Sequence, residues 1–428
     1  MRYRRIALLF IVFAAFPLFA RQPVKFPVKI DSVIIMGNDK TRDEVLLREI
    51  PFDFPDSLTL EDLQVIQNRL NNLFLFNRVE MRVVTAGNRN MLLIQVGELW
   101  YIYPVPIFFL NDREWSRISY GFQLTHLNFR GMNEQLSVGG WLGYNPSFFL
   151  RYYNPWVGRK SRLILSLNAF GKKVGNRFFD FDEQHLLLRL TVGKRLTLHR
   201  SITSTISFRR IKLPEEYKSF SVSGTGTDLI PKISLTFQDD HRNLIEYPTE
   251  GYFINWSISR AGFNKHQPNF WRFDFDHRLY VKLSKRISVG GRNLLRLNRG
   301  SLPIYDRIFI GYLERIRGYF DRRMTGQNLM LQSYEMRINL LPIKYLSWKS
   351  APAFSPFFQN LKYGLSMGIF LDSGIVWNRK EEFSLKNQFT GYGIGLHFHL
   401  PYIYIMRLDR AWNDRGEGEW IFEALVSF

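Results

Sequence analysis

The chain has 428 residues, enough for one large domain with a small one or for two or three domains of ordinary size. It contains no cysteine, which excludes a disulfide framework and a cysteine-rich metal site. Aromatic residues make up 16% of the chain while its mean hydropathy is only −0.17, which excludes a bundle of membrane helices and favours a β-barrel with a wet interior.

The start of the chain has the pattern of an export signal. Three arginines within the first five residues precede the apolar run from Ile6 to Phe19, which is short for a membrane-spanning helix. We predict a signal peptide over residues 1–20, cleaved after Ala20, and we find no later apolar stretch long enough for a membrane helix. The net charge of +20 is spread singly along apparent strands, so we expect an anionic membrane surface and no nucleic acid as partner.

Residues 21–99 predict a small α+β domain. Thr41 is expected to cap a short helix, and Thr59 a second one, with Asp62 at the capping-box spacing. The predicted order is strand, helix, helix, strand, strand, over residues 28–35, 41–50, 59–73, 78–84 and 91–96. The resulting sheet should keep an open edge that can accept a strand from another chain.

From residue 100 to 428, alternation at strand spacing replaces helical periodicity. Between Trp271 and Leu283, for example, one face is apolar except for His277, and the other is charged. After a signal peptide, so many long alternating strands favour an outer-membrane β-barrel over a soluble sandwich. We predict roughly sixteen antiparallel strands: 102–110, 117–128, 134–144, 147–154, 161–170, 182–193, 201–209, 229–238, 251–259, 269–282, 286–296, 328–340, 362–377, 389–399, 402–410 and 419–428. The long 341–361 connection falls where a short turn is expected, and we assign it no role.

The two ends of the predicted barrel meet at a seam. Pro104 and Pro106 lack N–H groups on the same side of the first strand, which indicates a weak, openable junction with the last strand. An equally good interpretation is that residues 101–106 form an extended linker and the first strand starts later. The last strand ends on Phe428, and a terminal aromatic strand resembles the sorting signal of outer-membrane barrels.

Several short motifs resemble two known families. The first domain resembles a POTRA domain at Gly37-Asn38, Thr41, Leu70, Phe76 and Val79. The segment Ile316-Arg317-Gly318-Tyr319 resembles the Val-Arg-Gly-Phe/Tyr signature of the Omp85 superfamily. Further segments resemble turns and a strand of that family: Asn128 to Gly131, Asn154-Pro155, Asp240 to Gly251, and Phe370 to Gly374. BamA-like members usually carry several POTRA domains, whereas this sequence has room for one before residue 100.

Alternation also indicates what Arg317 would meet. Asp372 and Glu335 both fall on the lumenal faces of their predicted strands. Three glycines, Gly391, Gly393 and Gly395, share one face of the next strand and leave space for a chain segment. With the family resemblance, we predict that the loop 297–327 folds into the lumen and is pinned by Arg317 to both carboxylates. On its own, Arg317 would be interpreted as a solvated loop charge.

The sequence offers no catalytic site. His397 and His399 share a strand face, but two ligands do not make a metal site, and we expect neither metal nor cofactor nor enzymatic activity. The resemblance implies an outer-membrane assembly or insertion factor with its POTRA-like domain in the periplasm. Its implied partners are unfolded outer-membrane proteins, outer-membrane lipids, and periplasmic chaperones or accessory subunits. The alternatives are a pore that translocates polypeptide or lipid and a passive outer-membrane channel.

Overall fold

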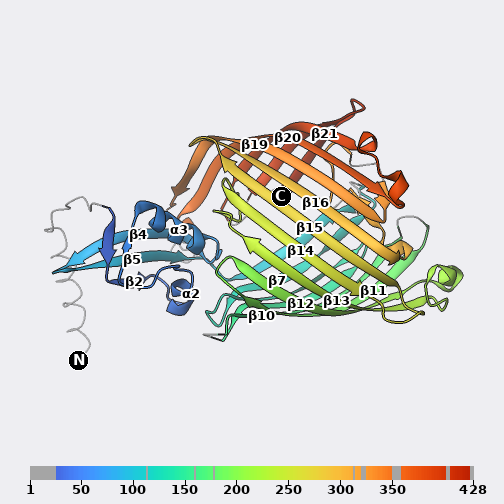
Figure 1. Ribbon diagram of the computed structural model, residues 1–428, viewed down its shortest axis with the longest axis horizontal. Helices are drawn as coiled ribbons and strands as arrows, with labels where there is room; N and C mark the ends of the chain where they lie inside the picture. Colours follow the sequence, from blue (N-terminus) through green and yellow to red (C-terminus); the bar gives the residue numbers. More distant parts are fainter. Residues whose placement is uncertain are drawn as a thin grey trace.

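The protein forms a small N-terminal domain joined to one end of a large barrel of tilted strands (Figure 1). The computed structural model describes residues 26–111, 114–158, 161–176, 179–311, 314–319, 324–348, 358–401 and 405–424. The predicted signal peptide and Phe428 therefore lie outside the described residues. Within those residues, every helix is too short or too polar to cross a membrane.

The N-terminal domain is an α+β unit built on a three-stranded sheet. Its elements are β1 (Val28–Ile30), β2 (Ser32–Met36), α2 (Asp43–Leu47), β3 (Asp56–Leu58), α3 (Leu60–Asn71), β4 (Phe76–Ala86) and β5 (Arg89–Glu98). The sheet order is β2-β5-β4, with β2 parallel to β5 and β4 antiparallel to it. Ile66 and Leu70 of α3 are fully buried in the domain core, as the helical spacing requires. Since β5 lies in the middle, β2 and β4 each have one edge without a strand partner among the described residues.

The two predicted helix caps have different outcomes. Thr59 and Asp62 form the expected capping box: the Thr59 hydroxyl accepts the Asp62 N–H at 3.2 Å, and the Asp62 carboxylate accepts the Thr59 N–H at 2.8 Å. The prediction for Thr41 is wrong, because α2 starts at Asp43 with Arg42 at its N-cap. The Thr41 hydroxyl is instead buried and donates to Glu98 Oε1 at 2.6 Å. Because α2 begins two residues later, at Asp43, the Thr41 hydroxyl contacts Glu98 and Asn128 of other segments instead of accepting from the helix N–H groups.

The large domain is one antiparallel sheet of sixteen strands that curls into a barrel, as predicted. In sequence order the strands are β6 (Ile102–Leu110), β7 (Ile118–Phe129), β8 (Glu134–Gly143), β9 (Ser147–Val157), β10 (Leu163–Gly175), β11 (Asp182–Arg195), β12 (Arg200–Lys212), β13 (Thr227–Asp240), β14 (Gly251–Ala261), β15 (Asn269–Lys282), β16 (Ile287–Ser301), β19 (Asn328–Leu346), β20 (Leu361–Trp377), β21 (Phe389–His399), β22 (Ile405–Asn413) and β23 (Gly418–Ala424). A short 3-10 helix, η3 (Glu215–Phe220), lies between β12 and β13, and η6 (Lys380–Glu382) and η7 (Leu385–Asn387) lie between β20 and β21.

Some predicted strand ends need correction. β16 continues to Ser301, so the inward loop spans 302–327 and not 297–327. β19 continues to Leu346 and β20 begins at Leu361, so the predicted 341–361 connection is shortened to residues 347–360. β22 begins at Ile405, while residues 402–404 lie outside the described part of the chain. These errors occur where polar strand ends pass into loops and the alternation fades.

The strands have the two faces that the alternation predicts. In β11, Leu186, Leu188, Leu190 and Val192 are 40–52% exposed on the outer surface, where lipid would cover them. Arg189 and Thr191 alternate with them and line a lumenal cavity. The same alternation around the barrel puts apolar side chains outside and charged ones inside.

The barrel has a seam between its first and last strands. The sheet order runs from β23 to β6, and each of these two strands pairs with one neighbour within the described residues. β6 begins at Ile102, so Pro104 and Pro106 lie inside the first strand, and the linker interpretation of residues 101–106 is wrong. No hydrogen-bonded ladder joins β6 to β23 in the part of the chain that the structure describes.

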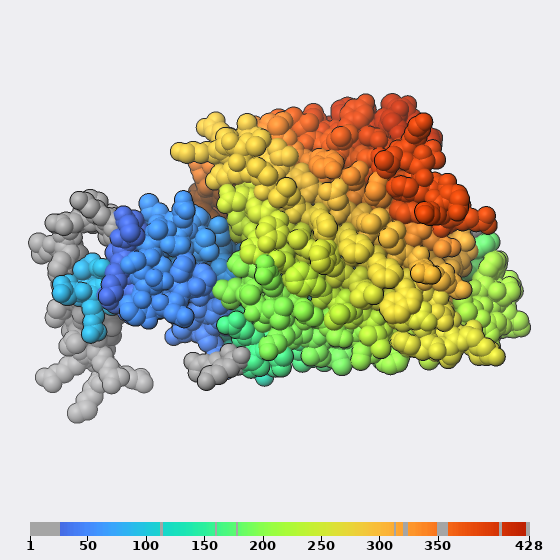
Figure 2. All heavy atoms as spheres, in the orientation of Figure 1, coloured from blue at the N-terminus to red at the C-terminus, as the bar shows by residue number. Residues whose placement is uncertain are grey.

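The N-terminal domain packs against one end of the barrel (Figure 2), the end that carries the turn at residues 130–133. The Arg42 N–H donates to Gly131 O at 3.0 Å, and the Asn128 side-chain amide donates to Thr41 Oγ1 at 2.8 Å. Gly131 has a φ of +71°, and a side chain there would collide with the Lys40 carbonyl. The family-like turn at residues 128–131 is therefore shaped for close contact with the small domain.

Candidate functional site in the barrel lumen

The connection between β16 and β19 folds into the barrel lumen. It contains a short 3-10 turn, η4 (Ile304–Asp306), and a two-stranded hairpin of β17 (Ile308–Ile310) and β18 (Met324–Gly326). Apolar residues of this loop form one buried cluster with the inner wall: Leu294, Ile308, Ile310, Ile316, Tyr319, Met324, Leu329 and Leu331. The loop therefore has a small core of its own, and its tip at residues 314–319 contributes Ile316 and Tyr319 to that core and carries the polar side chains between them.

Arg317 at the loop tip is the centre of a buried ion-pair network. Its side chain is 1% exposed and donates to Asp372 with both arms of the fork, from Nε to Oδ2 at 2.7 Å and from Nη2 to Oδ1 at 2.8 Å. Nη1 donates to Glu335 Oε2 at 2.9 Å. The structure thus brings together the three residues that we expected to meet. The guanidinium also lies 3.5 Å from the centre of the Phe370 ring, a cation–π contact.

The network extends beyond these three residues and is electrically balanced. Arg337 Nε donates to Glu335 Oε1 at 2.8 Å, and Arg407 Nη1 lies 3.4 Å from Asp409 Oδ2. Asp409 also lies 3.6 Å from Arg317 Nη1. Three buried arginines therefore face three buried carboxylates, counting Asp372. Charges removed from water require this kind of pairing, because an unpaired one costs several kcal/mol, about 3–5 when one partner of a pair is removed.

The three glycines of β21 accommodate this network, each in a different way. A side chain at Gly391 would collide with the Arg317 carbonyl oxygen. One at Gly393 would meet the Phe370 ring at 2.6 Å, and one at Gly395 would enter the Asp409 carboxylate. The backbone of β21 at these glycines is therefore covered by the Arg317 backbone, the Phe370 ring and the Asp409 carboxylate.

The loop tip is also tied to the last strand of the barrel. The Gly318 N–H donates to Glu419 Oε1 at 2.7 Å, and the Gly318 carbonyl accepts the Asn413 side-chain amide at 3.0 Å. Arg315 forms an ion pair with Glu423 of β23, which also accepts Arg407 Nη2 at 2.8 Å. The signature segment therefore bridges the inner wall and one side of the seam.

Sequence reasoning missed Asp409 and Glu423, although a signal for both existed. Arg407 and Asp409 are two residues apart in β22, and Glu419 and Glu423 are four residues apart in β23, so each pair shares one strand face. Charged residues that share one face of a barrel strand indicate the lumenal face. What alternation does not give is which strand lies opposite the loop.

The two histidines of β21 lie beside hydroxyl groups of Tyr247 and of β20. His397 Nδ1 lies 2.8 Å from the Tyr247 hydroxyl, and His399 Nε2 lies 3.0 Å from the Ser366 hydroxyl. Among the described residues there is no group of three or more His, Cys, Asp or Glu side chains that could hold a metal ion.

The remaining residues predicted from the sequence lie in the loop cluster and in the first strand of the barrel. Tyr319 is buried in the apolar cluster of the loop, and its hydroxyl donates to Asp414. Ile316 lies in the same cluster with 1% exposure. Pro104 and Pro106 lie in β6, the first strand at the seam.

Comparisons with known proteins agree with this architecture. A sequence model described as the Omp85 superfamily domain matches residues 128–424. A second one, the surface antigen variable number repeat of the POTRA type, matches residues 28–98. The outer membrane protein assembly factor BamA of Nitratidesulfovibrio vulgaris is 22% identical over 378 residues, which cover 84% of this chain and 45% of that protein. The chain thus spans about half the length of this curated relative.

Solved structures show the same fold at low identity. BamA from Haemophilus ducreyi lacking POTRA domains 1–3 has a TM-score of 0.55 and 17% identity, over 93% of this chain and 83% of that one. CdiB from Escherichia coli has a TM-score of 0.58 and 14% identity, over 94% of this chain and 75% of that one. The family match covers well over half of the chain. This protein therefore belongs to the Omp85 superfamily, as an outer-membrane β-barrel with a periplasmic POTRA domain.

Proposed function

We propose that this protein assembles or inserts other β-barrel proteins into the outer membrane, with the edges of β6 and β23 as the template. The observation that carries the proposal is the seam, where β6 and β23 share no ladder in the described residues. A strand edge with unpaired N–H and C=O groups can accept a strand from another chain. Within the membrane those groups have no water to bind, so an incoming strand would satisfy them.

The lumenal loop is proposed to control this edge. Its tip holds β23 through the bond between Gly318 and Glu419 and through the ion pair between Arg315 and Glu423. The same tip is fixed to the barrel wall by Arg317. While the loop is docked, β23 is held from inside, and an undocked loop would leave it free to move. The buried charges then act as a structural pin and not as catalytic groups.

The client is proposed to enter from the periplasmic side. A cavity of about 350 Å³ lies between the POTRA domain, β6 and the hairpin of β19 and β20. Its walls carry apolar and aromatic side chains from all three parts, among them Phe74, Phe76, Tyr103, Val105, Tyr345 and Leu361. An unfolded barrel protein exposes alternating apolar side chains that suit such a cavity. Added to the open edge of β4, whose Phe76 lines this cavity with Tyr103 and Val105 of β6, a client strand would lie close to the seam. Periplasmic chaperones or accessory subunits would deliver clients to the same domain.

Disulfide cross-linking across the seam tests the proposal, since the chain has no cysteine of its own. Cysteine pairs would be placed at Ile107 or Phe108 of β6 and Ile421 or Phe422 of β23, and the pair that oxidises most completely would be used. The matched control is a pair at Val105 and Gln123, which face each other in the ladder of β6 and β7. We expect the seam cross-link to reduce the maturation of other outer-membrane proteins in cells and reductant to restore it. The control cross-link should leave maturation unchanged.

Full maturation with a quantitatively oxidised seam would refute the seam mechanism. Deleting residues 26–98 then separates the remaining functions, because a passive channel would conduct ions equally well without the POTRA domain. A pore that translocates lipid or one dedicated polypeptide would depend on that domain but would leave the maturation of other barrel proteins intact.

A further inference from the structure

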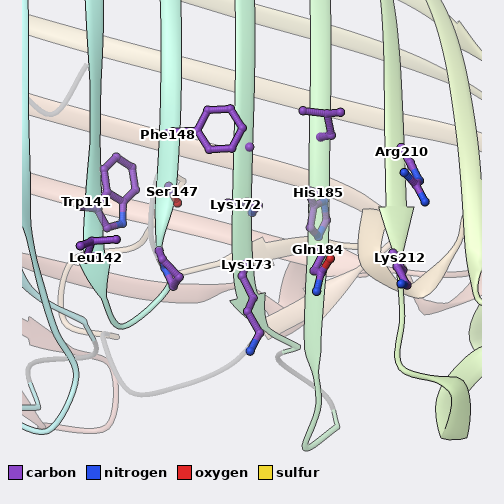
Figure 3. A pocket seen from close by; sticks show the side chains of 13 residues that line it. Trp141, Leu142, Ser147, Phe148, Lys172, Lys173, Gln184, His185, Arg210 and Lys212 are labelled. Carbon is purple, nitrogen blue, oxygen red and sulfur yellow. The ribbon is translucent and has the colours of Figure 1, made fainter.

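A groove on the outer wall of the barrel combines apolar and cationic side chains. It has a volume of about 570 Å³ and crosses β8 to β12 at their ends far from the POTRA domain (Figure 3). The turn at residues 130–133, at the opposite end of β7 and β8, contacts that domain. Because the POTRA domain is periplasmic, the groove faces the outer leaflet of the membrane.

The strand register arranges the outward side chains in rows across the barrel. Directly opposed residues of adjacent strands point to the same face, and rows two residues apart along a strand lie about 7 Å apart. The row nearest the membrane centre is apolar and consists of Leu150, Ala169, Leu188 and Phe208. The next row consists of Phe148, Gly171, Leu186 and Arg210. The row nearest the strand ends consists of Lys173, Gln184 and Lys212.

The middle row makes the hollow. A side chain at Gly171 would collide with the ring of Phe148, so this ring lies over the glycine. Phe148 is 58% exposed and Leu186 is 44% exposed, which leaves an apolar surface that an acyl chain can cover. In Figure 3, Lys173, Gln184 and Lys212 lie closer to the strand ends than Phe148 and Arg210.

The charges of the groove are only partly neutralised. Lys173 forms an ion pair of 2.8 Å with Asp182. Arg210 and Lys212 are exposed on the same face of β12, and within the described residues no carboxylate lies within ion-pair distance of either. An Arg or Lys on the lipid face destabilises a barrel by about 2–4 kcal/mol at the membrane midplane but by only about 0–1 kcal/mol near the interfaces. Near the strand ends these two cations are therefore compatible with a stable barrel. Two uncompensated cations, Arg210 in the row of the hollow and Lys212 in the next row toward the strand ends, complement an anionic amphiphile.

We propose that this groove binds a phosphorylated lipid of the outer leaflet. Arg210 and Lys212 hold the phosphate, and an acyl chain of the same lipid lies against Phe148 and Leu186. The guanidinium of Arg210 offers a planar fork to two phosphate oxygens, and the ammonium of Lys212 binds a third as a point charge. This site is independent of the lumenal loop and of the seam, and the proposal stands whether or not the protein inserts other barrels.

The test uses the full-length protein and native mass spectrometry of bound lipid. Phosphatidylglycerol and bisphosphorylated lipid A are the phosphorylated anionic probes, and phosphatidylcholine is the zwitterionic reference. Arg210→Gln and Lys212→Gln each remove one charge from the groove. Lys194→Gln is the matched control, since Lys194 is an exposed lysine at the periplasmic end of β11. Heat-dependent gel mobility verifies that each variant has folded.

We expect the wild type to bind one or both anionic lipids more tightly than phosphatidylcholine. Each groove substitution should lower that affinity about tenfold or more, the effect of losing one charge-assisted hydrogen bond, while Lys194→Gln leaves it unchanged. The proposal is overturned if folded Arg210→Gln and Lys212→Gln retain the wild-type affinity. It is equally overturned if Lys194→Gln loses as much, because the charges would then act without a specific site.

Discussion

Replacing Arg317 with alanine should release the lumenal loop from the barrel wall. The change removes three side-chain hydrogen bonds and leaves Asp372 and Glu335 buried, each about 1% exposed. Glu335 keeps its bond to Arg337 at 2.8 Å, whereas Asp372 loses the arginine that held both of its oxygens. Removing one partner of a buried pair costs about 3–5 kcal/mol, which corresponds to at least a ~100-fold rise in the undocked population.

A single cysteine in the loop can report this release. Ile310 lies in β17 of the same loop and is fully buried, and the chain contains no other cysteine, so Ile310→Cys is a unique reporter. The rate of maleimide modification of this thiol in lipid nanodiscs should rise at least ~100-fold when Arg317→Ala is added. The control is Arg200→Ala, because the Arg200 side chain is 50% exposed and its ion pair with Asp239 contributes about 0–1 kcal/mol.

An unchanged modification rate in Arg317→Ala, with the barrel folded, would show that the apolar cluster alone holds the loop and that the pin is not needed. Exchanging the charges, Arg317→Asp with Asp372→Arg, should restore protection only in part. Glu335 and Asp409 would then face a carboxylate at position 317. The wild-type protein has no such like-charge repulsion, so the double variant should remain less protected than the wild type.

Three further changes test separate parts of the structure. Gly391→Ala should loosen the loop and impair function, because the new methyl group meets the Arg317 carbonyl, whereas Gly175→Ala should be neutral in the same thiol assay, since its nearest contact is 3.7 Å. Asn72→Ala should weaken the docking of the POTRA domain by about 1–3 kcal/mol, because its side chain makes two hydrogen bonds to the turn after β13, and faster proteolysis between the domains would measure this. Burial lowers the pKa of His199 in the turn between β11 and β12, so the neutral form is favoured in the folded state. Stability should therefore be lost as pH falls below about 6.5, and a melting temperature of His199→Gln with the same pH dependence as the wild type would contradict this.

Much of the fold is determined by local patterns in the sequence. Alternation of apolar and polar residues assigns each strand an outer and an inner face, and this put Glu335 and Asp372 in the lumen without knowledge of their neighbours. The capping box at Thr59 depends on residues three positions apart, so it too is a local property. The signature around Arg317 placed the chain in its family because the motif is contiguous.

Only the tertiary structure decided which residues meet across the barrel. Asp409 joins the network, and Glu419 and Glu423 tie the loop to β23, because strands distant in sequence close around the loop tip. Thr41 has a helix-capping sequence context, yet its hydroxyl binds Glu98, a partner 57 residues away. The outer groove likewise depends on the register of β9 to β12, and a slip of one residue would turn Arg210 into the lumen. Sequence periodicity gives the face of a residue, whereas its partners depend on strand register and on how the sheet curls.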